Sequence, residues 1–146
     1  TEVFARGYNL IDPEIGNAGD IDTGVIVLTF ENNVTVTIEN SRKATYGYDQ
    51  RLEVFGSMGM INVENPLKNT SSFFDEQGAH LPRHLDFFMD RYAVSYQLEV
   101  EAFILALQKK EPMPITGDDG LKAMLTAEAA KLSVRQNRPV RIAEVV

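Results

Sequence analysis

Two histidines, His80 and His84, stand four residues apart, a spacing at which two metal ligands can share one face of a helix. Pro82 lies between them, and no suitable third ligand stands close by in the sequence. The pair therefore has two interpretations, a metal site or a polar loop that precedes a helix. We favour the loop and predict no metal ligands.

Pairs of glycines separated by two residues occur three times, at 16–19, 56–59 and 117–120. Only the last pair opens a predicted helix, as a phosphate-binding loop would require. Asp118 and Asp119 stand between those two glycines, where they would repel a phosphate but suit the first turn of a helix. No G-x-G-x-x-G or Walker sequence is present, so we predict no cofactor-binding residues.

Other catalytic and calcium-binding patterns are also incomplete. Residues 19–23 read G-D-I-D-T, but they lack the regularly spaced carboxylates of a calcium loop, and a solvated turn is expected. No G-x-S-x-G sequence is present, and neither histidine has a persuasive serine and aspartate partner. The chain therefore offers no self-contained set of catalytic residues.

The segment 44–59, A-T-Y-G-Y-D-Q-R-L-E-V-F-G-S-M-G, places Tyr46 and Tyr48 on either side of Gly47. One interpretation is an aromatic strand corner in which Gly47 permits a bulge or a close backbone approach. The other is the lip of a binding site, because tyrosine hydroxyls are good hydrogen-bond partners for polyols. The residues alone favour the corner, and periodicity alone places Tyr92 and Tyr96 in a helix core.

The composition limits the protein class. A length of 146 residues fits a single domain over residues 1–146. The formal net charge of −7 and the scattered basic residues argue against a nucleic-acid partner. No apolar run is long enough for a membrane span, and the absence of cysteine suits a reducing cytoplasm. The chain begins with neither a signal peptide nor a methionine, which is consistent with a piece of a longer protein.

The front half predicts strands and the back half predicts two helices. Residues 34–39 alternate strictly between apolar and polar side chains, whereas 25–30 is apolar on both faces and should be covered on both sides. Further strands are expected over residues 2–10, 51–55 and 60–63, with a short edge strand at 71–74 and a loop at 12–20.

The first helix carries an apolar stripe that recurs every three or four residues: Phe88, Tyr92, Tyr96, Val100, Phe103 and Leu107. The second helix opens near Asp118 and stops before Pro139. Strands followed by helices predict an α+β fold with an open, mainly antiparallel sheet and two C-terminal helices packed on one face.

Four segments resemble the C-terminal domain of the glucose–fructose oxidoreductase / inositol dehydrogenase (Gfo/Idh/MocA) family. They are G-D-I-D-T-G-V-I-V-L-T-F-E-N-N, I-E-N-S-R-K-A-T-Y-G-Y-D-Q-R-L-E-V-F-G-S-M-G-M, F-F-M-D-R-Y-A-V-S-Y-Q-L-E-V-E-A-F and P-I-T-G-D-D-G-L-K-A-M-L-T-A-E-A-A-K-L-S. The resemblance covers nearly the whole chain, and the second segment is most similar to the inositol 2-dehydrogenase branch. It implies a dihydrodipicolinate-reductase-like C-terminal domain whose outer sheet face forms dimers and tetramers.

The resemblance also implies what this chain lacks. In the family, an N-terminal Rossmann domain binds NAD or NADP, and the residues that handle the proton lie upstream of the segment that corresponds to Thr1. The chain would contribute only the substrate-side wall, with Tyr46 and Tyr92 at positions near the substrate. We therefore expect a domain of a cytoplasmic NAD-dependent enzyme that oxidises a ring secondary alcohol, inactive when isolated. The alternatives are a dehydrogenase of another cyclitol or sugar, and a non-catalytic interaction domain.

Overall fold

The computed structural model describes all residues from 1 to 146, and they form two compact units. Unit 1 combines Thr1–Lys43 with Met113–Val146, and unit 2 is Ala44–Pro112. The whole chain contains mainly antiparallel sheet and two long helices, which confirms the predicted α+β class. None of the helices combines the length and hydropathy needed to cross a bilayer.

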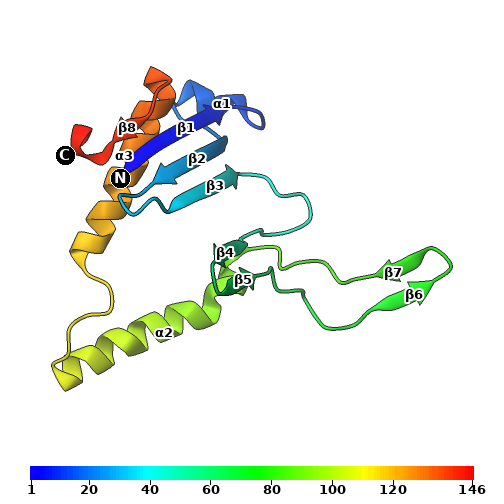
Figure 1. Cartoon of the computed structure of the whole chain (residues 1–146). Coiled ribbons are helices and arrows are strands. Elements are labelled where there is room, and N and C mark those ends of the chain that lie inside the picture. The colour runs from blue at the N-terminus through cyan, green and yellow to red at the C-terminus, as the bar shows by residue number, and fades with distance from the viewer. The chain divides into compact units, whose positions relative to one another are not determined.

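Unit 1 is built on a four-stranded antiparallel sheet with the order β3-β2-β1-β8 (Figure 1). Its strands are β1 (Glu2–Tyr8), β2 (Thr23–Thr29), β3 (Thr35–Ser41) and β8 (Val140–Arg141). Val3 of β1 lies opposite Leu28 of β2 on one side and Val140 of β8 on the other. Strand β8 was not predicted, because two residues carry too little alternation to be recognised as a strand.

The core of unit 1 lies between this sheet and α3 (Gly117–Gln136), which runs alongside β1 (Figure 1). Its buried apolar residues are Val3, Ala5, Leu28, Ala129, Ala130 and Val140. The alanines of α3 have short side chains, so the helix can approach the sheet closely. Ser133 is also fully buried, and its hydroxyl accepts from the Ala5 N–H at 2.9 Å while donating to the Arg138 carbonyl at 2.6 Å.

The start of α3 confirms the role expected for the acidic residues between Gly117 and Gly120. Thr116 is the N-cap, and a capping box joins its side chain and backbone to Asp119. The Asp119 carboxylate accepts from the Thr116 N–H at 3.0 Å and from the Thr116 hydroxyl at 2.9 Å. The helix N-terminus is therefore occupied by the chain's own carboxylate.

The segment after β1 corrects the prediction of a simple loop at 12–20. It contains a short helix, α1 (Pro13–Asn17), with Asp12 as its N-cap and proline at the first helical position. The Asp12 side chain accepts from the Glu14 N–H at 3.0 Å. Both signals were present in the sequence, but the helix is only five residues long and buries none of them.

Asp22 closes this segment onto the sheet. Its side chain is buried, with 3% of the residue exposed. The carboxylate accepts three backbone N–H groups, from Leu10 and Ile11 at 2.9 Å and from Asp12 at 3.0 Å, and the Thr23 hydroxyl at 2.9 Å. Burial raises the pKa of this carboxyl, but the four donors outweigh it and bring the pKa to about 2. Asp22 therefore acts as a structural anion and not as part of a calcium loop.

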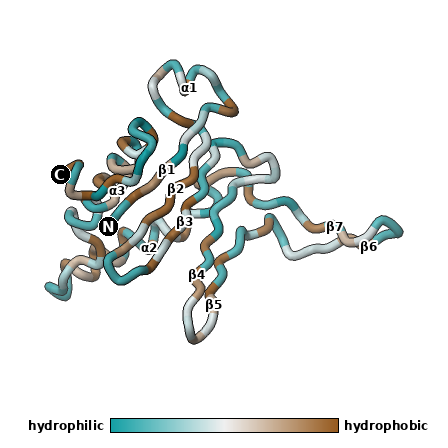
Figure 2. Tube along the Cα trace, turned by 45° about the horizontal axis from the view of Figure 1, so that its top comes forward, coloured by the Kyte–Doolittle hydropathy of each residue, from teal (hydrophilic) through white to brown (hydrophobic).

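The sheet face opposite α3 carries apolar side chains that unit 1 leaves open. Val25 of β2 is 42% exposed, and Val27 of β2 and Phe4 of β1, on the same face, are half-buried. Figure 2 shows hydrophobic residues along much of β1 and β2. Residues 25–30 were expected to be covered on both sides. Within unit 1 only the face toward α3 is covered.

Unit 2 contains two hairpins and one long helix. The predicted strands at 51–55 and 60–63 are confirmed as β4 (Leu52–Gly56) and β5 (Gly59–Val63), which pair across a turn between Gly56 and Gly59. The expected edge strand at 71–74 is corrected: β6 (Phe73–Asp75) pairs with β7 (Gly78–His80) in a separate two-stranded hairpin (Figure 1). Strand β7 is three residues long and contains a glycine, so its sequence carries almost no strand signal.

The helix of unit 2 is α2 (Phe88–Lys109), which ends in a left-handed residue at Lys110. Its beginning is partly covered, because Phe88 and Tyr92 are half-buried. The other four residues of the predicted apolar stripe are exposed, and the one buried residue of the helix is Ala106, which is not part of that stripe. The predicted helix is confirmed, whereas the predicted burial of its stripe is seen only at the first two positions.

Candidate functional site

Gly47 fixes the path of the tyrosine segment. Its φ of 129° lies in a region that side chains other than glycine rarely adopt. A Cβ atom there would come within 2.8 Å of both the His84 Cβ and the Leu85 carbonyl oxygen. The next residue, Tyr48, donates its N–H to that carbonyl at 2.7 Å. The predicted close backbone approach at Gly47 is thereby confirmed.

Asp49 gathers the polar groups that follow. Its carboxylate accepts from the Tyr46 hydroxyl, from Arg51 through Nε and Nη2 at 2.9 Å each, and from Asn65 Nδ2 at 2.5 Å. Asn65 is buried and also accepts the Gln50 N–H at 2.8 Å through its Oδ1. Asn65 thus joins the segment that follows β5 to the segment that precedes β4, and two distant parts of the sequence together hold one carboxylate.

This network shifts the pKa values of its members in opposite directions. The Arg51 guanidinium, followed by the Tyr46 hydroxyl, lowers the pKa of Asp49 far below its usual value. The hydrogen bond to Asp49 is the main reason that the pKa of Tyr46 is raised above its usual value. Asp49 is consequently an anion and Tyr46 a neutral phenol at any pH near 7.

The structure brings Tyr92 against Tyr48. Their rings meet edge to face at 5.9 Å between centroids, and Tyr96 adds a second edge contact with Tyr92 at 6.5 Å. Burial, together with the adjacent Tyr92, raises the pKa of Tyr48. Tyr46 instead packs its ring against His84 at 5.8 Å. The two predicted site residues therefore contact different partners. Tyr46 packs on His84, whereas Tyr92 packs on Tyr48, two residues along the same segment.

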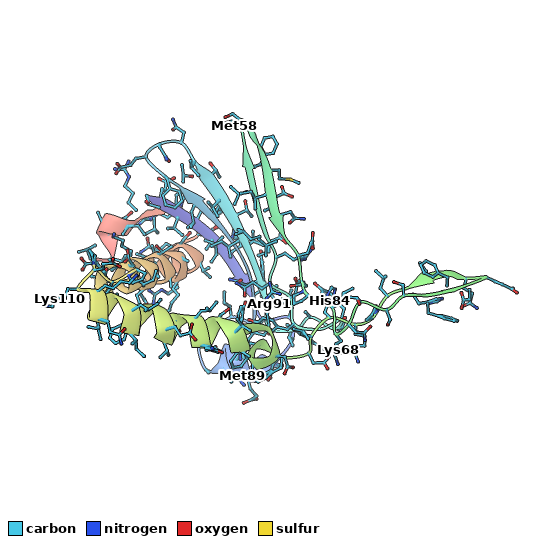
Figure 3. All side chains as sticks on the ribbon, turned by 90° about the horizontal axis from the view of Figure 1, so that it is seen from below. Met58, Lys68, His84, Met89, Arg91 and Lys110 are labelled. Atoms are coloured by element: carbon cyan, nitrogen blue, oxygen red, sulfur yellow. The ribbon has the colours of Figure 1, made fainter.

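Three buried polar atoms beside this segment have no hydrogen-bond partner. They are His84 Nδ1, Arg91 Nε and the Tyr92 hydroxyl. The Arg91 guanidinium donates to the Gln50 carbonyl at 3.0 Å and lies 5.7 Å from the centre of the Tyr92 ring. Figure 3 labels His84 and Arg91, and it shows Met58 at the far tip of the β4–β5 hairpin. Unpaired buried polar atoms are uncommon, and their gathering here marks the segment as a candidate binding surface.

Sequence reasoning did not single out Asn65, Arg91 or the Tyr48–Tyr92 contact. Asn65 is an ordinary loop residue by its sequence, and Arg91 looks like an exposed helix position. The one signal for Arg91 was that it directly precedes Tyr92 in a segment that resembles the family. Their roles depend on contacts across 15 or more residues, which the spacing of residues along a strand or helix does not reveal.

The two histidines have different partners. His80 Nε2 lies 3.0 Å from Asp75 Oδ1 within the β6–β7 hairpin, whereas His84 packs on Tyr46. No group of three or more histidine, aspartate or glutamate side chains is arranged to hold a metal ion. The glycine pair that opens α3 encloses Asp119, whose carboxylate caps that helix N-terminus.

Comparison with known proteins places these features in context. The family model described as "Oxidoreductase family, C-terminal alpha/beta domain" matches residues 2–142. The chain is 48% identical over 145 residues to myo-inositol 2-dehydrogenase of Thermotoga maritima, covering 99% of this chain and 43% of that protein. It is 42% identical over 141 residues to inositol 2-dehydrogenase of Rhizobium meliloti, covering 97% of this chain and 43% of that protein.

Solved structures agree. A probable dehydrogenase from Thermotoga maritima superimposes with a TM-score of 0.96 at 48% identity, over 99% of this chain and 44% of that one. Scyllo-inositol dehydrogenase from Lactobacillus casei, with bound NAD(H) and scyllo-inositol, gives a TM-score of 0.87 at 28% identity, over 97% of this chain and 42% of that one. The chain thus spans less than half the length of the relatives that it matches.

Proposed function

Because the chain belongs to this oxidoreductase family as its C-terminal alpha/beta domain, we propose that it forms the substrate-side wall of an inositol 2-dehydrogenase. The observation that carries the proposal is the 48% identity to a myo-inositol 2-dehydrogenase over 99% of this chain. The proposed reaction is the NAD-dependent oxidation of a ring secondary alcohol. Because this chain contains no G-x-G-x-x-G sequence, NAD would bind to a separate N-terminal Rossmann domain.

In this proposal the tyrosine segment binds and orients the polyol. Tyr46 and Tyr92 are the proposed substrate-binding residues. We add Tyr48 to them because its ring contacts that of Tyr92. The unpartnered Tyr92 hydroxyl supports this role, because a buried hydroxyl without a partner costs about 1–3 kcal/mol. A hydroxyl of the substrate would supply the missing hydrogen bond. Correct orientation matters because small misplacements of the reacting carbon slow the chemical step strongly.

The test is a kinetic screen of the full-length gene product with NAD and a panel of inositols and sugars. We expect turnover of myo-inositol or scyllo-inositol, and none by residues 1–146 alone. Tyr92→Phe should raise KM about three- to tenfold, the value of one neutral hydrogen bond, while leaving thermal stability nearly unchanged because no protein partner is lost. Tyr96→Phe on the next turn of α2 is the matched control. Failure of the full-length protein to oxidise any polyol would refute the proposed activity.

We further propose that residues 1–146 act as one substrate-binding and oligomerisation domain of a cytoplasmic homotetramer. The support for association is the open apolar sheet face that includes Val25, Val27 and Phe4. Light scattering of the full-length protein tests it. We expect a mass of four subunits that falls when Val25 is replaced by glutamate, and a monomer for the unmodified protein would contradict the proposal.

A further inference from the structure

We infer that Asp49 is a positioning residue that fixes the Tyr46 hydroxyl as a hydrogen-bond acceptor toward the substrate. The group that faces Tyr46 must then be a donor, so this position selects a hydroxyl over any group that can only accept. The inference rests on the proposed function, and it adds a rule of substrate selection that similarity to inositol dehydrogenases does not supply.

The geometry of Asp49 leaves it little freedom. Oδ1 accepts from Arg51 Nε and Asn65 Nδ2, and Oδ2 accepts from Arg51 Nη2 and the Tyr46 hydroxyl. The Asp49 side chain is 17% exposed, and Asn65 is itself held by the Gln50 N–H. A carboxylate with both oxygens engaged by a planar guanidinium cannot turn away from the phenol.

The Tyr46 hydroxyl has one proton, and it is directed to Asp49. Because Asp49 remains ionised and Tyr46 remains protonated near neutral pH, this donor–acceptor order does not reverse. A phenol oxygen that donates its proton retains lone pairs that can accept. Tyr46 is also 49% exposed, so those lone pairs are open to a ligand.

The chemical consequence is selection by hydrogen-bond polarity. A polyol hydroxyl can donate to the Tyr46 oxygen. A fluorine, a keto oxygen, a carboxylate or a phosphate in the same place brings lone pair against lone pair and adds the repulsion of the Asp49 anion nearby. The site should therefore prefer neutral polyols with a free hydroxyl at that ring position.

Monofluorinated myo-inositols provide the test, because fluorine resembles a hydroxyl in size but cannot donate. In the full-length enzyme we expect one positional isomer with a KM about tenfold above that of myo-inositol, a penalty that disappears in Tyr46→Phe. Asp49→Ala should remove the same penalty, since the phenol could then turn and donate. Asp75→Ala is the control, because Asp75 is an aspartate of the same unit that bonds to His80.

A spectroscopic measurement keeps the inference testable if Asp49→Ala folds poorly. In the chain labelled with ¹³C at the tyrosine ring carbons, Tyr46 should titrate above the usual tyrosine pKa, and Asp49→Asn should lower that pKa. An unchanged Tyr46 titration would overturn the inference, as would fluorine penalties that are the same in Asp49→Ala. Absence of any polyol oxidation would instead overturn the proposed function, and the two failures are distinguished by whether myo-inositol itself is turned over.

Discussion

Asp22 in unit 1 and Asp49 in unit 2 are both carboxylates held by four hydrogen bonds, but their donors differ in kind. Asp22 binds three backbone N–H groups and one threonine hydroxyl. Asp49 binds only side chains, from Tyr46, Arg51 and Asn65. The first carboxylate fixes the course of a loop, whereas the second fixes the direction of a hydroxyl. The same chemical group thus serves the fold in one unit and the proposed binding surface in the other.

The two units also differ in how many apolar side chains they bury. Unit 1 holds the apolar core between β1, β2, β8 and α3. In unit 2 the buried residues are Asn65 and Ala106, and the apolar side chains of both hairpins and of α2 are largely exposed. Substitutions in the core of unit 1 should therefore lower the free energy of unfolding more than most substitutions in unit 2. The exception is Gly47 of unit 2, where there is no room for a side chain.

Gly47→Ala should have the largest effect, because it adds a Cβ where the backbone is already in contact. Positive φ and the clash with Leu85 together are expected to cost about 3–4 kcal/mol of the unfolding free energy. Gly59→Ala is the matched control, since Gly59 has a φ of 149° but nothing within 4 Å of its Cβ position. Its cost should be about 1–2 kcal/mol, measured by urea denaturation. Equal losses in the two variants would show that the contact at Gly47 is unimportant.

Val3→Ala should come second, at about 2 kcal/mol, because it removes two methyl groups from the fully buried centre of unit 1. Val25→Ala on the neighbouring strand is the control, as its side chain is on the open face and 42% exposed. In the chain 1–146 that change should cost less than about 1 kcal/mol by the same denaturation assay. A comparable loss at Val25 would indicate that the open face is covered in solution.

Acid should weaken the fold through its carboxylates, with no effect at neutral pH. The pKa of Asp22 falls from 3.8 to about 2 on folding, and that of Glu144, bound by Arg138 and the Arg141 N–H, falls from 4.5 to about 2. Because the folded pKa is the lower one, their stabilisation is complete above about pH 4.5 and is lost as the pH falls to 2. Urea denaturation between pH 5 and 2 should show this decline, reduced in Asp22→Asn. Stability that rises toward pH 2 would contradict the assignment.

The regular parts of both units were predictable because their patterns are local. Strict alternation at Val34–Glu39 predicted β3, and the three-to-four-residue spacing from Phe88 predicted α2. Strand β8 could not be predicted, because Val140 becomes a strand residue only by pairing with Val3 at the other end of the chain. The short strand β7 depends in the same way on its partner β6.

The candidate site was less predictable than the fold. Tyr46 and Tyr92 came from a resemblance to a family, not from a pattern of chemistry in the sequence, and their binding role stays a prediction. The cluster that holds Tyr46 requires Asn65, which lies 16 residues from Asp49 and contacts it through a loop. Tyr48 and Tyr92 meet across two separate elements. Such contacts follow from tertiary packing, which neither propensity nor spacing encodes locally.

The return of β8 to β1 has a consequence for biosynthesis. Val140 pairs with Val3, and the Ile142 N–H donates to the Thr1 carbonyl at 3.2 Å, so unit 1 joins the two ends of the described chain. During translation, Ala44–Pro112 is synthesised before α3 and β8. The unit that carries the tyrosine segment can begin to fold first, while the apolar core of unit 1 must wait for α3 and β8. Premature termination after α2 would therefore leave β1 and β2 exposed to aggregation.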